Sequence, residues 1–421
     1  MDGLTRSSIR LSRGDTAYVV GIVSGAHFLS HVYLLAYPPL FPLIGAEFDL
    51  TTTQLGLLVT AIYLPTLVLQ LPLGELVDRI GAKRILAAGL VVTSLGVSLS
   101  GLATSYWTLL ALAFVSGIGQ SVFHPADYAL LESVTDSTNQ GSAFGLHTFG
   151  GFAGFAAAPI VTGTIGVRVG WQAALLVVGS LGFVYAAIVL LTTESVYRRQ
   201  IRDSSPDAGV AVSGAAADVK KTVTDLLGLF RSELLVVFSF YLVSMMAIVA
   251  FQSFTTVFAV ESLEFAESTA NNVLTAYLVG TAVGVVAGGP LADRVPFQPV
   301  IVASFTVAAV GVWFAVGMAS DAGFVLAASI FGVVGLATGL ALPARDKLAN
   351  SFAAAGSTGK SFGFFFTGLS LGAVISPVLI GAIIDARSVV AALLVAGGFL
   401  VVAASIVVAV RLLELPRTNA G

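Results

Sequence analysis

Hydrophobic residues follow one another along most of this chain in long stretches that contain very few charges. Each stretch has roughly 20 or more residues, which is the length that an α-helix needs to cross about 30 Å of hydrocarbon. Short polar segments separate the stretches. The pattern predicts twelve transmembrane helices, at residues 16–45, 52–78, 83–104, 107–133, 139–167, 170–193, 233–260, 268–292, 297–319, 323–350, 359–385 and 389–413.

The polar segment at residues 194–232 is much longer than the others. It is rich in Ser, Ala, Gly and Asp, which is typical of a flexible linker, and DVKKTVTDLLGLF within it predicts a short helix on the membrane surface. Six predicted helices precede it and six follow. We therefore expect an all-α membrane protein made of an N-terminal six-helix bundle at 1–193, a cytoplasmic linker at 194–232 and a C-terminal six-helix bundle at 233–421.

The composition agrees with a lipid-embedded chain. Hydrophobic residues make up 57% of the sequence and charged residues only 10%, whereas a soluble domain has about 25% charged residues. The net charge of −3 gives no reason to expect a nucleic-acid partner. With no cysteine, the chain has neither disulfides nor thiolate metal sites, and we expect no cofactor.

The positions of the basic residues predict the orientation. Of the 20 Lys and Arg residues, all except Arg168 and Arg387 fall on one side of the predicted membrane. Because cytoplasmic loops carry the excess of Lys and Arg, we expect both termini in the cytoplasm and the protein in the cytoplasmic membrane. Trp107 and Trp171 then lie at the outer surface, where indole rings favour the interface.

The two halves contain repeated segments in the same order. GELVDR at 74–79 recurs as GPLADR at 289–294. AFGLHTFGGFAGFAAAPIVTG at 143–163 matches SFGFFFTGLSLGAVISPVLIG at 361–381 at Phe144, Gly145, Gly150, Gly154, Pro159 and Gly163, which align with Phe362, Gly363, Gly368, Gly372, Pro377 and Gly381. Six predicted helices separate the copies. Since this number is even, both halves have the same orientation and are related by an axis along the membrane normal.

These residues carry a family resemblance. GELVDRIGAKR at 74–84, with its echo at 289–294, resembles the loop signature of the major facilitator superfamily, and the resemblance extends over the whole chain. AHFLSHVYLLAYPPLFPLI in the first helix and GIGQSVFHPAD in the fourth are similar to the fosmidomycin-resistance-type branch. The resemblance implies two bundles around a central cavity and secondary active transport of a small molecule by alternating access, as a monomer.

The chain departs from the pattern of many proton-coupled exporters of this superfamily. Their fourth helix carries an arginine where this chain has Ala113, and their fifth helix places Pro directly after a Gly, whereas four residues separate Gly154 from Pro159 here. The first helix also lacks an acidic residue. The usual antiport residues are therefore not visible in the sequence.

The loop motif predicts a latch between the halves. Asp78 ends the second helix on the side where the eleventh begins, and a carboxylate beside a helix N-terminus is stabilised by about 0.3–1 kcal/mol. By the repeat, we expect Asp293 to lie beside the N-terminus of the fifth helix in the same way. The alternative is a basic loop that only fixes topology. The candidate gate and latch residues are Gly74, Asp78, Arg79, Gly81, Lys83, Arg84, Gly289, Asp293 and Arg294.

All four histidines lie within predicted helices of the first half. His27 and His31 are four residues apart and share one helical face, and His124 and His147 are in the fourth and fifth helices. Ionisable groups at membrane depth are usually functional, and an imidazole titrates near neutral pH. The histidines are therefore candidates for proton coupling; the alternative is neutral histidines that hydrogen-bond between helices. A zinc site would have only Asp127 to support His31 and His124, so we predict none.

An acid and a base occupy equivalent positions in the two halves. Pro125–Asp127 aligns with Pro343–Arg345 by the same offset as the longer repeat. In the superfamily, the fourth and tenth helices approach each other at the cytoplasmic end of the cavity. We infer that Asp127 and Arg345 pair there when the inner gate closes, with Asp346, Lys347 and Glu132 nearby, and that opening the gate changes the affinity of Asp127 for a proton. The alternative is an ordinary helix-end charge at the water boundary.

Together these features predict a proton-coupled exporter of a small polar, anionic or amphipathic solute. Arg345 or protonated histidines would neutralise an anion, and the aromatic cluster at 362–366 suits an amphipathic drug. Proton-linked uptake of an organic anion and a ligand sensor without transport are the alternatives. An enzyme is not expected, because the sequence offers no nucleophile with an oriented base and no H-E-x-x-H metal motif.

Overall fold

The computed structural model describes residues 13–136, 138–192, 232–317, 323–352 and 358–414. All of the predicted linker except Ser232, the first residue of α12, lies outside these residues. Every regular element in the described part is helical. In chain order the elements are α1 (Arg13–Leu34), the 3-10 turn η1 (Pro38–Leu40), α2 (Phe41–Phe48), α3 (Thr52–Ile80), α4 (Ala82–Ser100), α5 (Tyr106–Gln120), α6 (Phe123–Val134), α7 (Gln140–Ala158), the π-helical turn η2 (Pro159–Gly163), α8 (Thr164–Val169), α9 (Trp171–Thr192), α12 (Ser232–Glu261), α13 (Glu267–Arg294), α14 (Phe297–Val316), α15 (Phe324–Phe352), α16 (Thr358–Ala386) and α17 (Val389–Glu414).

The predicted transmembrane helices are confirmed. Within the described residues, 12 apolar helical segments are long enough to cross a membrane, and their ends lie within a few residues of the predicted bounds. The clearest difference is the third segment, which we predicted to reach Thr104 but which ends at Ser100. The chain turns there through hydrogen bonds such as Ala103 N–H to the Ser100 carbonyl, and Ser105 then caps α5.

Three of the spans are interrupted, and in each case the interruption lies at or near a proline. The first span breaks before Pro38 and the fifth forms the π-helical turn that starts at Pro159. The fourth span stops at Gln120 and restarts at Phe123, because Pro125 has no N–H to donate to the Ser121 carbonyl. By contrast, α15 continues through Pro343 without a break.

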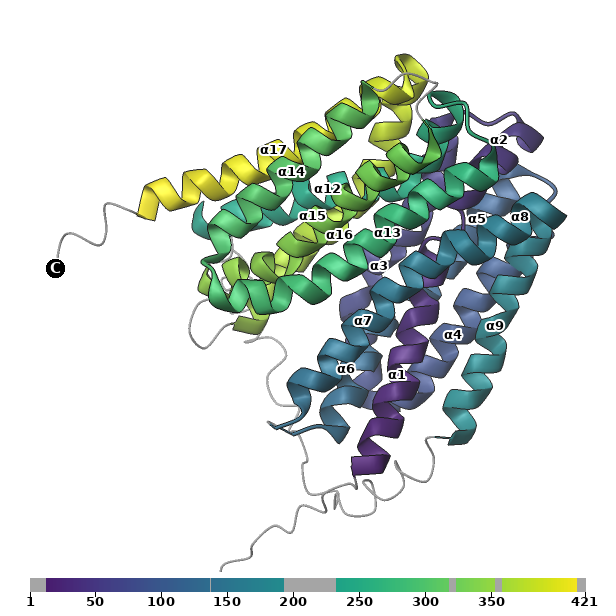
Figure 1. Ribbon diagram of the computed structural model, residues 1–421. Helices are drawn as coiled ribbons and strands as arrows, with labels where there is room; N and C mark the ends of the chain where they lie inside the picture. The colour runs from purple at the N-terminus through teal and green to yellow at the C-terminus, as the bar shows by residue number, and fades with distance from the viewer. Residues whose placement is uncertain (1–12, 137, 193–231, 318–322, 353–357, 415–421) are drawn as a thin grey trace, which may run out of the picture.

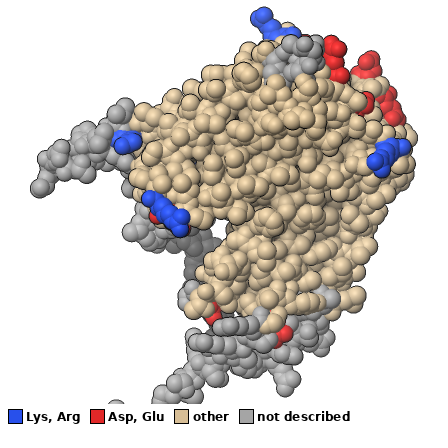
Figure 2. Space-filling view, in the orientation of Figure 1, with Lys and Arg blue, Asp and Glu red and all other residues tan. Residues whose placement is uncertain are grey.

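The helices run between two ends of the molecule. At the basic end α3 meets α4 and α13 stops, next to Arg79 and Arg294; at the opposite end α3 begins and α16 stops, at Thr52 and Ala386. Figure 1 shows the two bundles close together at the opposite end, near α2, and splayed apart toward the basic end. Figure 2 shows a notch between them and a broad uncharged surface that suits contact with lipid.

Contacts between the halves gather at the opposite end, where α3 packs against α16 and α7 with η2 packs against α13. The hydroxyl of Thr60 donates to the Val374 carbonyl at 2.7 Å. Gly56 lies so close to the Pro377 carbonyl that an added Cβ would be 2.2 Å from its oxygen. The opposite end is therefore closed in this conformation.

Candidate functional site

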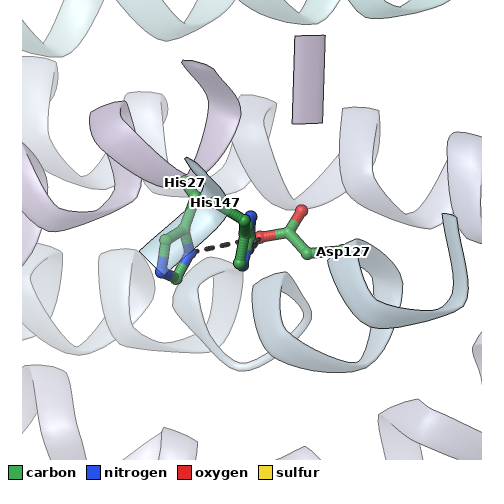
Figure 3. Close-up of side chains that lie close together, drawn as sticks. All are labelled: His27, Asp127 and His147. Atoms are coloured by element: carbon green, nitrogen blue, oxygen red, sulfur yellow. Dashed lines mark ion pairs between the residues drawn. The ribbon is translucent and has the colours of Figure 1, made fainter. Parts of the chain in front are cut away.

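The site is built around one buried carboxylate. Asp127 lies in the first turns of α6, just after the break before Pro125, and its side chain is 0% exposed. Its Oδ2 is 3.2 Å from Nδ1 of His27 on α1 and 3.8 Å from Nε2 of His147 on α7. Figure 3 shows both imidazoles directed toward this carboxylate. Three helices of the first half therefore meet at a single ionisable group.

The other two histidines complete the cluster. The ring of His27 stacks on that of His147 at 3.9 Å between centroids, and lies 4.4 Å from His31 and 5.3 Å from His124. Tyr128 stands next to both His124 and His147, at 5.8 Å from each. The predicted shared face of His27 and His31 is confirmed, and all four histidines come together.

Glycines on α7 make room for the imidazoles. An added Cβ at Gly151 would be 2.7 Å from Nε2 of His27 and 2.7 Å from Cε1 of His31. At Gly154 it would be 2.1 Å from the Phe28 carbonyl oxygen. The close approach of α7 to α1 therefore depends on residues without a side chain at these positions.

The cluster is poor in hydrogen bonds. Among the described residues, both carboxylate oxygens of Asp127, both ring nitrogens of His147 and Nδ1 of His27, His31 and His124 are buried without a hydrogen-bond partner. Buried polar groups are normally paired. Groups that contact one another without fixed hydrogen bonds can accept, hold and pass on protons.

One donor set lies close enough together to be considered for a cation. In the described part of the chain, ligand atoms of His27, Asp127 and His147 all lie within 4.8 Å of one another. Zinc with bonds of about 2 Å in a tetrahedral site holds its ligand atoms about 3.3 Å apart, so this set would have to contract around an ion. The set differs from the one considered from the sequence, which used His31 and His124.

A second charged group lies in the other half, at the repeat-equivalent position. Arg345 on α15 donates from Nε to Oδ1 of Asp346 at 3.0 Å and pairs with the same oxygen through Nη2, and its guanidinium carbon lies 4.7 Å from the ring centroid of Tyr241 on α12. The hydroxyl of Tyr241 donates to the same Oδ1 at 2.9 Å. Sequence reasoning missed Tyr241, which only the packing of α12 on α15 brings to this position.

The predicted gate pair is not formed in this conformation. Asp127 contacts histidines of its own half, whereas Arg345 contacts Asp346. Lys347 pairs with Asp293, and Glu132 is exposed. Because the halves are apart at the basic end, an Asp127–Arg345 pair could form only after that end closes, and it stays a prediction.

The loop motif lies at the basic end. Asp78, Arg79, Arg84 and Arg294 are exposed, Lys83 is buried, and Arg79 pairs with Glu75 one turn earlier. Gly81 joins α3 to α4 with φ 99°, which a residue with a side chain rarely adopts. Gly74 contacts Pro125 on α6, while Gly289 faces open space. Among the described residues no hydrogen bond or ion pair of Asp78 is found, so the predicted latch also stays a prediction.

A latch that the sequence analysis missed joins the halves at the opposite end. Oδ1 of Asp385 accepts the Thr52 N–H at 2.8 Å, and Oδ2 accepts the Thr53 N–H at 2.9 Å. Both threonine hydroxyls donate to the same carboxylate. The carboxylate thus binds the N-terminus of α3, where free amides and the helix dipole favour an anion.

The comparisons with known proteins agree with this architecture. The family model of the Major Facilitator Superfamily matches residues 23–266 and 234–421, which together cover most of the chain. The chain belongs to this superfamily. Its fold is that of a solved superfamily transporter, a bacterial homologue of the human lysosomal transporter Spinster in an inward-facing and occupied conformation, with a TM-score of 0.78, 16% identity and coverage of 95% of this chain and 97% of that one.

Two curated relatives show the range of the superfamily around this member. The fosmidomycin resistance protein of Escherichia coli K12 is 27% identical over 88% of this chain and 87% of its own. A probable sulfoacetate transporter, SauU of Cupriavidus necator, is 29% identical over 39% of this chain and 38% of its own. The predicted family and its fosmidomycin-resistance-type resemblance are confirmed, and this superfamily member is a multi-pass membrane transporter of small organic solutes.

Proposed function

We propose that this protein exports a small organic anion across the cytoplasmic membrane in exchange for protons, by alternating access. The observation that carries the proposal is the buried carboxylate of Asp127 between the imidazoles of His27 and His147. Ionisable groups at membrane depth are costly, and proton relays are one of the uses for which they are kept. The first helix lacks an acidic residue, and in this proposal Asp127 supplies the proton-binding carboxylate instead.

The coupling follows from the position of Asp127 beside a helix break. The carboxylate sits just after the break between α5 and α6, so movement of α6 against α1 and α7 changes its distance from both imidazoles. A change in these contacts changes how tightly the group holds a proton. Other titratable groups on α6 or on helices that pack against it are Asp15, Tyr18, His31, Tyr33, Tyr63, Glu75, Asp78, Arg79, Lys83, Arg84, His124, Tyr128 and Glu132, and Tyr185 on α9 lies within electrostatic range of Asp127.

The anionic class of the solute rests on Arg345 and on the relatives. Arg345 is a cation whose side chain is mostly enclosed by protein, and an arginine in such a place suits a carboxylate, sulfonate or phosphonate. The relatives are named for fosmidomycin and sulfoacetate, which are small organic acids. Export is the leading direction because one of these names refers to drug resistance.

The proposed orientation places the basic end in the cytoplasm. Arg79, Arg84 and Arg294 lie there, and Lys and Arg favour cytoplasmic loops. In this orientation the closed opposite end faces outward and the conformation is open toward the cytoplasm, ready to receive a solute for export.

A proton-flux assay tests the proposal. Inside-out vesicles that contain the protein and a pH-sensitive dye are energised, and fosmidomycin, sulfoacetate and galactonate are added in turn. Release of protons on addition of a solute, lost in Asp127→Asn and kept in Glu264→Gln, supports proton-coupled export. Glu264 is a suitable control because its carboxylate is exposed at the opposite end.

The same preparation separates the alternatives. Solute accumulation in right-side-out vesicles, driven by an inward proton gradient, would instead support proton-linked uptake. Binding of a solute without any flux in either vesicle type would support a sensor.

A further inference from the structure

Arg345 is held by an unusual partner, its neighbour in sequence. Nε of Arg345 donates to Oδ1 of Asp346 at 3.0 Å, and Nη2 forms an ion pair with the same oxygen at 3.0 Å. Consecutive residues point to different sides of a helix, so the carboxylate has to turn back to reach the guanidinium. With the Tyr241 hydroxyl at 2.9 Å, one carboxylate oxygen accepts two hydrogen bonds and an ion-pair contact.

The two partners differ in their access to solvent. The side chain of Arg345 is 11% exposed, whereas that of Asp346 is 51% exposed. The cation is therefore fixed in the protein, held also by the Tyr241 ring beneath it. Asp346 can leave for water at a small cost in solvation, while Arg345 cannot.

Asp346 lies near the first half. Tyr128 on α6, next to Asp127, is within electrostatic range of Asp346. Lys347, one residue further on, is occupied by Asp293 and by the Ala292 carbonyl, so it does not compete for Asp346. The exposed carboxylate of Asp346 is therefore bound only on its Arg345 and Tyr241 side among the described hydrogen bonds and ion pairs.

An aromatic surface continues from the pair. The Tyr241 ring lies 5.9 Å from Phe365 and 6.2 Å from Phe366, and Phe366 lies 6.1 Å from Phe362. Phe365 is fully buried and supports the others, whereas the Phe366 ring is 39% exposed. A solute with an acid group at Arg345 would place its apolar part beside Phe366.

We propose that Arg345 and Tyr241 form the binding site for the acid group of the transported anion, and that Asp346 is a built-in counter-ion which the anion displaces. The inference rests on the proposed function for the class of the solute, a small carboxylate, sulfonate or phosphonate. The guanidinium and the phenol hydroxyl would give the incoming group the two hydrogen bonds and the ion-pair contact that Asp346 has now. Because one anion replaces another, the buried cation is never left unpaired.

Direct binding to the purified full-length protein in detergent tests this, with fosmidomycin and sulfoacetate as probes in isothermal titration calorimetry at constant pH. Asp346→Asn removes the competing charge and should lower the Kd of the acid probes by at least about tenfold. Arg345→Gln should abolish binding, and Arg345→Lys, which keeps the charge but lacks the fork, should weaken it. Arg168→Gln, a remote cation, should bind as the unmodified protein does. Glycerol serves as the uncharged probe, and its titration should be the same for every variant as for the unmodified protein.

Unchanged or weaker binding in Asp346→Asn would overturn the inference, as would retained binding in Arg345→Gln or the absence of acid binding in every variant. Size-exclusion profiles and thermal unfolding show whether each variant is folded. Tyr241→Phe gives a second test: it removes one hydrogen-bond donor without changing the shape of the ring and should weaken binding of the acid probes about threefold to tenfold. The assay uses no proton gradient. A failure of proton-coupled export would therefore leave this result standing, and a failure here would leave the flux result standing.

Discussion

Asp385 at the end of α16 binds the backbone amide of Thr52 at the start of α3, and so ties the second half to the first. The two residues are 333 positions apart in the chain. The Thr52 hydroxyl contacts both this carboxylate and the Gly381 carbonyl. In the proposed alternating-access cycle, this contact between a carboxylate and a helix N-terminus has to form and break once per cycle.

We expect Asp385→Asn to open the opposite end. Hydrogen bonds to a charged group contribute about 1.5–3 kcal/mol and neutral ones about 0.5–1.5, so the substitution should shift the conformational equilibrium about tenfold. The native chain has no cysteine. A single cysteine in place of Thr60, which lies on the α3–α16 contact, should therefore react faster with a maleimide in the variant.

Asp49→Asn is the matched control, because Asp49 is exposed at the same end and asparagine tolerates its left-handed backbone, with φ 52°. An equal reaction rate in Asp385→Asn and in the control would show that the Asp385 contact does not hold the halves together.

Gly151→Ala should disturb the histidine cluster without unfolding the protein. The new methyl group would be 2.7 Å from atoms of both His27 and His31. Overpacking of this kind costs about 1–3 kcal/mol, partly offset by the better helix propensity of alanine, worth about 1 kcal/mol. We expect a small change in thermal stability and a loss of transport of at least about tenfold, measured in the vesicle assay.

Gly145→Ala on the same helix is the control, since nothing lies within 4 Å of the added Cβ. It should transport normally and be slightly more stable. Equal activity of the two variants would argue against a role for the cluster geometry.

The transmembrane pattern and the shared face of His27 and His31 could be predicted because both depend on local rules. Helix length follows from the run of apolar residues, and the contact of His27 with His31 follows from their spacing of four. The partner of Asp127 could not be predicted. The repeat pointed to Arg345, but the pairing depends on which end of the molecule is closed, and that is a property of the conformation.

The Asp385 latch was missed for a related reason. The sequence shows an acid at the end of one apolar helix and a run of threonines before another, and each is ordinary by itself. Only the packing of α16 on α3 brings them together.

Gly151 could have been suspected as part of the histidine cluster, because it follows His147 by four residues on the same face of α7.

The two imidazoles beside Asp127 should matter more for coupling than the others. His27 and His147 lie 3.2 and 3.8 Å from the carboxylate, whereas His31 packs against Phe155. We expect His147→Gln and His27→Gln to reduce the proton flux per transported solute at least about tenfold, because each removes a buried ion-pair contact of the carboxylate. The same loss in His31→Gln, measured side by side at several pH values, would contradict this assignment.

Asp78→Asn should hold the basic end open. Asp78 is exposed in the present conformation, and the predicted contact with the N-terminus of α16 would form only when that end closes. Loss of the charge removes about 0.3–1 kcal/mol, up to about 2 if the contact excludes water, so the open population should rise roughly twofold to tenfold. Spin labels on cysteines in place of Glu132 and Ser351, exposed on the two halves, would show a shift of the distance distribution toward longer values. Glu75→Gln, one turn earlier on α3, should leave the distribution unchanged; a distribution in Asp78→Asn that matches this control would mean that the motif aspartate only fixes the topology of the loop.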